Sequence, residues 1–339
     1  MINVKLVSVS GGKDSTATLL LALERHPQDV MACFADTGNE HPIVYEYLDY
    51  LEQQTGIVIH RVKADFSDKW QRRIDYVRDK WPEKMRNPKP ILLNKSEVKE
   101  DGAEPIYKAV EPIPDHEITK IVSRALSVLE QGPTGIPFLD LCLLKARFPS
   151  RMAQFCTQEL KALPLTEFAL QVIDDYGSCE SWQGVRAEES ERRAKLPERE
   201  DKGGGYSIYR PILKWTVQEV FDLHKKHGID PNPLYKLGMG RVGCMPCVNC
   251  GKAEVLNIYK RYPEHIERIN EWEILVGMVS KRHSATFFES SGDNETAYQR
   301  GNIMQVVEWS KTQHGGKKMD LFAEFEEPEA CSSSYGLCE

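Results

Sequence analysis

The sequence predicts an α/β protein in which helices flank a twisted parallel sheet, and three observations carry this prediction. Aliphatic and β-branched runs of strand length alternate with helical segments, which is the pattern of βαβ units. A glycine-rich polar turn follows the first of these runs and opens a helix, as phosphate-binding loops do. The chain has 339 residues, 41% of them hydrophobic and 28% charged, as in ordinary globular proteins.

The polar turn has the sequence SGGKDS at residues 10–15. Its two adjacent glycines allow the backbone to approach an anion, and the free amides at the start of the helix favour negative charge. Lys13 adds a positive charge, while Ser10 and Ser15 add hydroxyl donors. Asp14 suits a phosphate site if a divalent cation such as Mg²⁺ bridges the two. The alternative is a simple glycine turn with a Ser/Asp cap, and the Walker A and Rossmann spacings are both absent.

Strand and helix signals alternate along the chain in the order that a parallel sheet requires. They are a strand at 5–9, a helix at 16–23, a strand at 30–35, a helix at 41–54, a strand at 58–62, a helix at 166–176, a strand at 181–185 and a helix at 217–227. Parallel strands end at one edge of their sheet, where α/β proteins bind ligands. Asp36 follows the second strand at this edge, although it would also serve to cap a turn.

A Gly-x-Arg turn at Gly184 and Arg186 follows the strand at 181–185. A guanidinium group binds phosphate oxygens in a bidentate way, so this turn suits a triphosphate. The charges that continue to Arg193 could instead form a solvated surface.

The length of the chain predicts a large core domain with a smaller appendage. Frequent prolines and mixed charges at 81–137 indicate an irregular insertion or lid. Basic residues gather at 72–89 and could meet a polyanion, or could form a solvated helix face. A helical stretch near 263–279 leads into a polar tail that contains Cys331 and Cys338.

The net charge of −7 means that the surface as a whole would repel nucleic acid. Such a partner would need a local basic patch or another subunit. Because no run of about 18 apolar residues occurs and the chain begins directly with a strand, we expect a cytoplasmic protein with no membrane partner.

Nine cysteines in a chain expected in the cytoplasm indicate metal ligands or reactive thiols rather than disulfides. Cys244, Cys247 and Cys250 are spaced at i, i+3 and i+6, with Gly and Pro around them. This spacing is typical of a chelating knuckle, although free thiols could also fall so by chance.

Together these motifs resemble the PAPS reductase family within the PP-loop ATP pyrophosphatases. The matching segments are SGGKDS at 10–15, FADTGNEHP at 34–42, FCTQELKALPL at 155–165, GVRAEES at 184–190, RPILKWT at 210–216 and NPLYKLGMGRVGCMPC at 232–247. The resemblance implies a parallel sheet with an adenosine nucleotide across its C-terminal edge. It places this domain at 1–260, with the insertion at about 81–137, and leaves 261–339 as a mostly helical, cysteine-containing extension.

Reductases of sulfated nucleotides typically replace the Gly-Gly-Lys-Asp segment and end in Glu-Cys-Gly-Leu-His. Here the loop is intact and the tail reads YGLCE at 335–339, so the resemblance favours ATP cleavage. The cysteine knuckle is similar to that of the sulfurtransferase in DNA phosphorothioation. We therefore expect an ATP pyrophosphatase that adenylates its target, with nucleic acid as sulfur acceptor and a cysteine desulfurase as donor. Alternatives are a thiol-dependent reductase using Cys338 or Cys331, and a non-catalytic nucleotide sensor.

The resemblance also assigns roles to residues. Lys13, Asp14 and Arg186 are the expected catalytic residues. The expected binding residues for ATP and Mg²⁺ are Ser10, Gly11, Gly12, Lys13, Asp14, Ser15, Asp36, Gly184 and Arg186. The expected ligands of a 4Fe-4S cluster are Cys156, Cys244, Cys247 and Cys250. Cys142 or Cys338 could replace Cys250, and Zn²⁺ is the alternative metal.

Overall fold

The computed structural model describes residues 2–93, 104–288, 301–313 and 318–319. A six-stranded sheet has the order β3-β2-β1-β6-β8-β7, and its strands are β1 (Ile2–Ser8), β2 (Val30–Asp36), β3 (Ile59–Lys63), β6 (Gly177–Gln183), β7 (Arg199–Gly203) and β8 (Tyr206–Tyr209). All neighbouring pairs are parallel except β7 with β8. The predicted parallel sheet is therefore confirmed.

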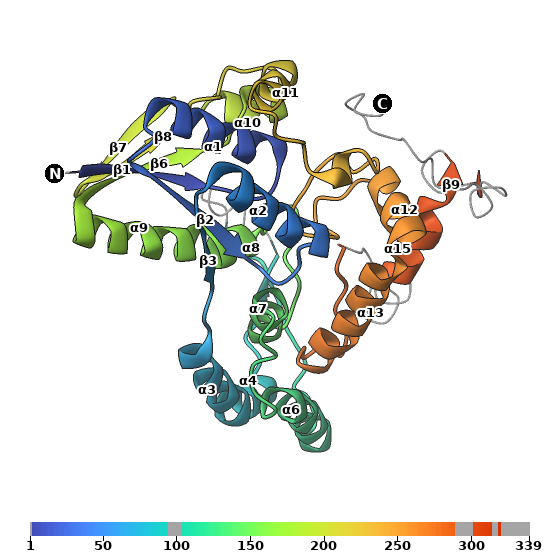
Figure 1. Cartoon of the computed structure of the whole chain (residues 1–339). Coiled ribbons are helices and arrows are strands. Elements are labelled where there is room, and N and C mark those ends of the chain that lie inside the picture. Colours follow the sequence, from blue (N-terminus) through green and yellow to red (C-terminus); the bar gives the residue numbers. More distant parts are fainter. Residues whose placement is uncertain (1, 94–103, 289–300, 314–317, 320–339) are drawn as a thin grey trace.

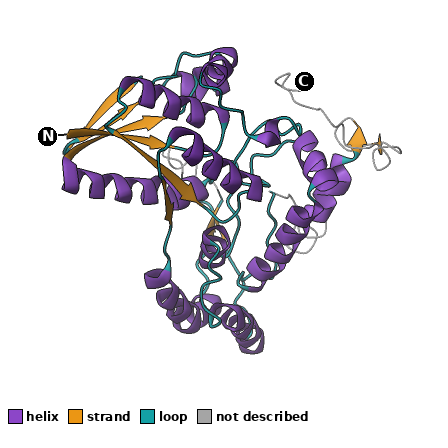
Figure 2. Ribbon diagram, viewed as in Figure 1, coloured by secondary structure: helices purple, strands orange, loops and turns teal. Residues whose placement is uncertain are grey.

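Helices cover both faces of the sheet (Figures 1 and 2). They include α1 (Lys13–Arg25), α2 (Pro42–Thr55), α9 (Leu163–Tyr176) and α11 (Val217–Lys226). Leu6 of β1 packs with α9, whereas Val7 belongs to the larger core on the other face. This alternation places one side chain on each face, as the pleat of a strand requires.

The remaining helices lie beyond the C-terminal ends of the strands (Figure 1). They are α3 (Ser67–Asp75), the π-helix η1 (Tyr76–Lys80), α4 (Trp81–Arg86), α6 (Asp115–Leu129), α7 (Pro137–Lys145), α12 (Lys252–Arg261), α13 (Pro263–Met278) and α15 (Ile303–Ser310). The short elements are β4 (Ile91–Leu92), β5 (Tyr107–Lys108), α8 (Phe155–Thr157), η2 (Gln158–Ala162), η3 (Ala187–Glu189), α10 (Glu191–Ala194), η4 (Pro233–Tyr235), β9 (Thr312–Gln313) and β10 (Lys318–Met319). No helix within the described ranges is both long and apolar enough to cross a bilayer.

The segment at 81–137 is more ordered than its prolines suggest. Its helix α6 has 15 residues and buries Ile118, Ala125 and Leu129 in the main core. The indole nitrogen of Trp70 in α3 donates a hydrogen bond of 2.7 Å to the Leu129 carbonyl. Because most prolines lie outside α6, they restrict the connections around it and leave the helix intact.

A buried glutamate joins α13 to the chain on either side of residues 289–300. The fully buried carboxylate of Glu273 accepts hydrogen bonds from the backbone nitrogens of Phe287, at 2.7 Å, and Ile303, at 2.9 Å. Burial raises the pKa of Glu273 from 4.5 to about 7, although the two hydrogen bonds act in the opposite direction.

We predict that Glu273 makes the stability of the protein fall between mildly acidic and neutral pH. The raised pKa of Glu273 favours the neutral carboxyl in the folded protein. Its contribution to the free energy of unfolding is therefore complete below the ordinary pKa of 4.5 and is lost as the pH rises towards 7. The loss should be on the order of 3 kcal/mol. Urea unfolding at several pH values should show a shallower fall for Glu273→Gln than for the unchanged protein.

The control for this experiment is Glu271→Gln, at an exposed position of the same helix. It should leave the dependence on pH as it is. Equal pH slopes for Glu273→Gln and the unchanged protein would contradict the assignment.

Candidate functional site

The SGGKDS turn connects β1 to α1 and has the conformation of an anion-binding loop. Gly11 has φ of +72°, and a Cβ there would lie 3.0 Å from the Val44 side chain, so glycine is required. The Ser15 hydroxyl accepts from the Ser10 backbone nitrogen at 3.0 Å and donates to the Gly12 carbonyl at 2.9 Å. The N-cap residue Gly12 has no side chain to cap the start of α1, as is usual where a helix N-terminus meets an anion.

Asp14 is the centre of a compact charge cluster. One carboxylate oxygen lies 3.2 Å from Lys13 Nζ, and the other lies 2.5 Å from Arg186 Nε. Arg186 follows β6, is 5% exposed and also contacts Glu188 at 2.6 Å. Burial lowers the pKa of Arg186, but Asp14 outweighs this effect, and the net shift is upward. The guanidinium therefore keeps its charge at the edge of the sheet.

These groups line a cavity of about 630 Å³, a volume typical of small-molecule sites. The predicted residues in its wall are Ser10, Gly12, Lys13, Asp14, Ser15, Gly184 and Arg186. The sequence analysis gave no binding role to the other lining residues, which are Glu189, Arg193, Tyr235, Gly240, Arg241, Val242 and Glu254. Gly11 shapes the turn from behind, because its carbonyl accepts from the Asn232 side chain at 3.1 Å.

Tyr235 supports the loop from a segment more than 200 residues away. Its hydroxyl accepts a hydrogen bond of 3.0 Å from the Lys13 backbone nitrogen, and Lys13 Nζ lies 5.4 Å from the centre of its ring. The buried His224 ring of α11 contacts the Lys13 carbonyl at 2.8 Å. The position of Lys13 is thus fixed from both sides of its backbone.

The structure does not bring Asp36 to this cavity. Its carboxylate is buried and accepts from the Tyr45 hydroxyl at 2.7 Å and the Gly38 backbone nitrogen at 2.9 Å. Lys63 Nζ lies 3.0 Å from its second oxygen. Asp36 therefore organises the turn after β2 and is not among the residues that line the cavity.

The cysteine loop lies against this second turn. Cys244 forms an isolated bridge with Glu40, and its sulfur lies 3.4 Å from the Thr37 hydroxyl. The Cys247 backbone nitrogen donates to the Cys250 sulfur at 3.2 Å, a contact that stabilises thiolates in metal-binding loops. Cys156 precedes η2 and acts on Cys247 electrostatically. The four predicted cysteines therefore belong to one region.

Lys161 is the cation of this region. Its pKa is raised, chiefly by the charge of Cys244, with further contributions from Cys247 and Cys156. Burial raises the pKa of the Cys244 thiol to about 12 and also raises those of Cys156 and Cys250. These thiols are therefore protonated at neutral pH unless a metal binds them.

Two cysteines are the proposed substitutes for Cys250. Cys142 is fully buried in α7 and acts on Cys156 electrostatically, so it stays an alternative. Cys338, like Cys331, lies outside the described residues.

The basic segment at 72–89 is largely paired within the protein. Arg78 contacts Glu130 at 2.8 Å, Arg86 contacts Asp115 at 2.7 Å and Lys80 contacts Glu83 at 3.5 Å. The Arg73 guanidinium lies between the rings of Tyr76 and Trp81. These contacts reduce the charge that the segment presents to a polyanion.

Comparison with known proteins identifies the family. The phosphoadenosine phosphosulfate reductase domain matches residues 5–98 and 143–250. The chain belongs to this family. The unmatched stretch between the two parts contains all of α6.

The relatives differ in how much of the chain they match. An uncharacterized 37.8 kDa protein of Escherichia phage 186 is 42% identical over 350 residues, which cover 99% of this chain and 97% of that protein. The adenosine 5′-phosphosulfate reductase of Allochromatium vinosum is 40% identical over 65 residues, which are 19% of this chain and 25% of that reductase. The phosphoadenosine 5′-phosphosulfate reductase of Buchnera aphidicola is 22% identical, with 71% of this chain and 69% of that enzyme covered.

A solved structure of phosphoadenylyl-sulfate reductase from Candida auris, a phosphate complex, is similar with a TM-score of 0.37 and 14% identity. The match covers 73% of this chain and 83% of that one.

We predict that Gly184→Ala disrupts the anion-binding turn. A Cβ at Gly184 would lie 2.8 Å from the Asp14 carbonyl carbon and oxygen and from the Ser15 nitrogen, so the backbone of the turn must shift. Such overpacking costs about 1–3 kcal/mol, equivalent to a loss of nucleotide affinity of about tenfold to a hundredfold. Calorimetric titration with ATP should measure this loss.

The matched control is Gly240→Ala, because Gly240 lines the same cavity but a Cβ there meets no atom within 4 Å. Equal affinity in the unchanged protein and Gly184→Ala would show that the nucleotide binds elsewhere.

Proposed function

We propose that the protein is an ATP pyrophosphatase that adenylates an acceptor for sulfur transfer. The observation that carries this proposal is the intact SGGKDS turn, with Asp14 held between Lys13 and Arg186 in the cavity wall. Two cations at the N-terminus of a helix suit a polyphosphate, and the acid suits a divalent cation bound beside it. Transfer of the adenylyl group is the reaction that uses all of these groups.

The charges in the cavity indicate how the substrate would be held. Triphosphate oxygens compete with Asp14 for Lys13 Nζ and Arg186, and binding moves both cations towards the phosphates. The partly exposed Asp14 carboxylate then needs a new positive partner. Asp14 would hold Mg²⁺, which supplies charge neutralisation between this carboxylate and the phosphates when bound.

In the proposed reaction an acceptor oxygen attacks the α-phosphorus of ATP. The bond between the α-phosphorus and the bridging oxygen breaks, and pyrophosphate leaves with that oxygen. Lys13, Arg186 and the first amides of α1 stabilise the charge that develops on it. A sulfur nucleophile then displaces AMP from the adenylated acceptor, so that sulfur replaces the activated oxygen.

We predict that the protein converts ATP to AMP and pyrophosphate, and that Lys13→Ala and Asp14→Ala each lower the rate at least about a hundredfold. Lys13→Ala removes a positive charge at the leaving group, and Asp14→Ala removes the carboxylate that would hold Mg²⁺. Product analysis by chromatography with Mg²⁺ present measures both effects. The control is Lys236→Ala, an exposed lysine next to Tyr235 that does not line the cavity. Release of ADP and phosphate would contradict the assignment.

Reduction of an adenylyl sulfate is the second candidate function. It is favoured by the continuity of the cavity wall with the cysteine loop, since Arg241 and Val242 immediately precede Gly243 and Cys244. In that reaction two thiols become a disulfide, while adenylyl sulfate becomes AMP and sulfite. Incubation with adenosine 5′-phosphosulfate and a thiol reductant distinguishes the two, because only a reductase releases sulfite. A nucleotide sensor would produce neither pyrophosphate nor sulfite.

We further propose that Cys156, Cys244, Cys247 and Cys250 hold a 4Fe-4S cluster. Their mutual electrostatic interactions and the hydrogen bond to the Cys250 sulfur support this assignment. When bound, a cluster supplies redox chemistry and sulfide beside the cavity. Lys161 would balance the thiolate charge in the loaded protein.

We predict that anaerobically purified protein is brown and contains about four irons per chain. Serine at Cys156, Cys244 or Cys247 should bleach it, whereas Cys179→Ser, in the core beneath α9, should leave the colour unchanged. Iron analysis and absorption spectra provide the measurement.

Two outcomes would revise the metal assignment. Full iron in Cys250→Ser would move the fourth ligand to Cys142 or Cys338. Colourless protein with one zinc ion per chain would refute the cluster.

The proposed acceptor is nucleic acid, and the proposed sulfur donor is a cysteine desulfurase. The acidic net charge and the paired cations of segment 72–89 favour an acceptor delivered by another subunit.

A further inference from the structure

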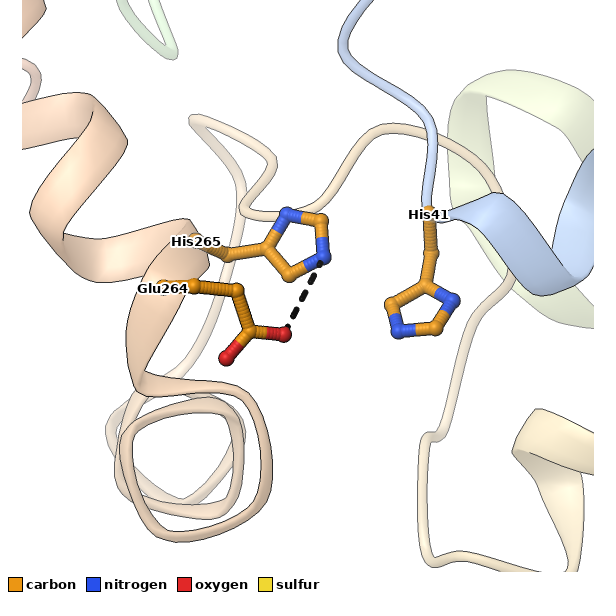
Figure 3. Close-up of side chains that lie close together, drawn as sticks. All are labelled: His41, Glu264 and His265. Carbon is orange, nitrogen blue, oxygen red and sulfur yellow. Dashed lines mark ion pairs between the residues drawn. The ribbon is translucent and has the colours of Figure 1, made fainter.

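Three side chains with potential ligand atoms meet outside the nucleotide cavity, beside the turn that contacts the cysteine loop (Figure 3). His41 lies immediately before α2, and Glu264 and His265 lie in the first turn of α13. A ligand atom from each lies within 4.8 Å of the other two. We propose that these three side chains bind one zinc ion.

The geometry brings the two imidazoles face to face. Their ring centres lie 4.9 Å apart with an angle of 28° between the planes, and His265 Nε2 lies 4.0 Å from Glu264 Oε1. Both histidines are buried, whereas Glu264 is exposed. Figure 3 shows the Glu264 carboxylate and the His265 ring directed towards His41. Two histidines and a carboxylate leave a fourth position open to water on the Glu264 side.

The donor types select the metal. Two imidazole nitrogens and one carboxylate oxygen suit Zn²⁺, while Ca²⁺ and Mg²⁺ prefer oxygen ligands alone. Burial lowers the pKa of both histidines, that of His265 to about 4. Both rings are therefore neutral at physiological pH, which is the form that binds metal.

Zinc binding by His41 costs the hydrogen bond that its ring now accepts. Its Nδ1 accepts a hydrogen bond of 3.0 Å from the Ile43 backbone nitrogen, so in the free protein the ring proton is on Nε2. Coordination through Nε2 moves this proton to Nδ1 and breaks the helix cap. One cap hydrogen bond is a small loss beside the affinity of zinc for such a set. Within the described structure, Nδ1 of His265 has no hydrogen-bond partner, although the ring also interacts with the Met245 backbone.

The site would stabilise the base of the cysteine loop. Asn39, two residues before His41, donates to the Pro246 carbonyl at 3.0 Å and accepts from Arg268 of α13 at 2.8 Å. A zinc ion bound by His41 and His265 would form a second link between the turn before α2 and helix α13. The proposal is independent of the proposed function, because none of its ligands lines the nucleotide cavity.

Equilibrium dialysis of the full chain against Zn²⁺ tests the site. We expect His41→Asn and His265→Gln each to bind about one ion fewer per chain than the unchanged protein. Asparagine is a good helix cap, so His41→Asn removes the ligand and keeps the start of α2. Glu264→Gln changes an exposed side chain with little risk to folding and should weaken the same ion. The exposed His116→Asn is the control and should bind as the unchanged protein does.

Cobalt identifies the ligands. The Co²⁺ spectrum lost in His265→Gln should show visible bands without thiolate-to-cobalt charge transfer, whereas cobalt on the cysteines shows it. Equal zinc content in the unchanged protein and all three site variants overturns the proposal. The proposal is also overturned if the Co²⁺ ion that is lost in His265→Gln shows the thiolate-to-cobalt charge-transfer band.

Discussion

The parallel pairing of β1 with β6 is the constraint on which the nucleotide cavity depends. Ser8 lies opposite Gln183 in this register, so the two chains leave the sheet side by side. The backbone after β6 then meets the SGGKDS turn so closely that only glycine fits at position 184. Two residues later the same chain delivers Arg186 to Asp14. A shift in this register would separate the two halves of the charge cluster.

The end of β2 has a different role from the one that its sequence suggests. Asp36 is occupied by Tyr45 and Lys63, and the residues after it carry the cysteine loop through Glu40 and Asn39. The ends of neighbouring strands at this edge therefore position two different groups of residues. The turns after β1 and β6 contribute to the cavity wall, while the turn after β2 contacts Cys244 and Pro246 of the cysteine loop.

Local patterns were sufficient to predict the parallel sheet and half of the residues in the cavity wall. The strands, the turn and the Gly-x-Arg segment all have signals within a few residues, and parallel pairing brings their ends together. The polar edge strand β7 has no such signal, because Arg199–Gly203 lacks a buried face. Tyr235, Arg241 and Glu254 join the cavity only through tertiary packing. The contact between His41 and His265 spans more than 200 residues and follows no motif.

Arg241 physically connects the cavity to the cysteine loop. It lines the cavity, and it interacts electrostatically with Cys247, Glu254 and Cys250. Burial lowers the pKa of Arg241, but the charges of the neighbouring groups together have a larger, opposite effect. The net shift is upward, so the guanidinium remains positive. A polyphosphate in the cavity and thiolates in the loop would therefore attract the same cation.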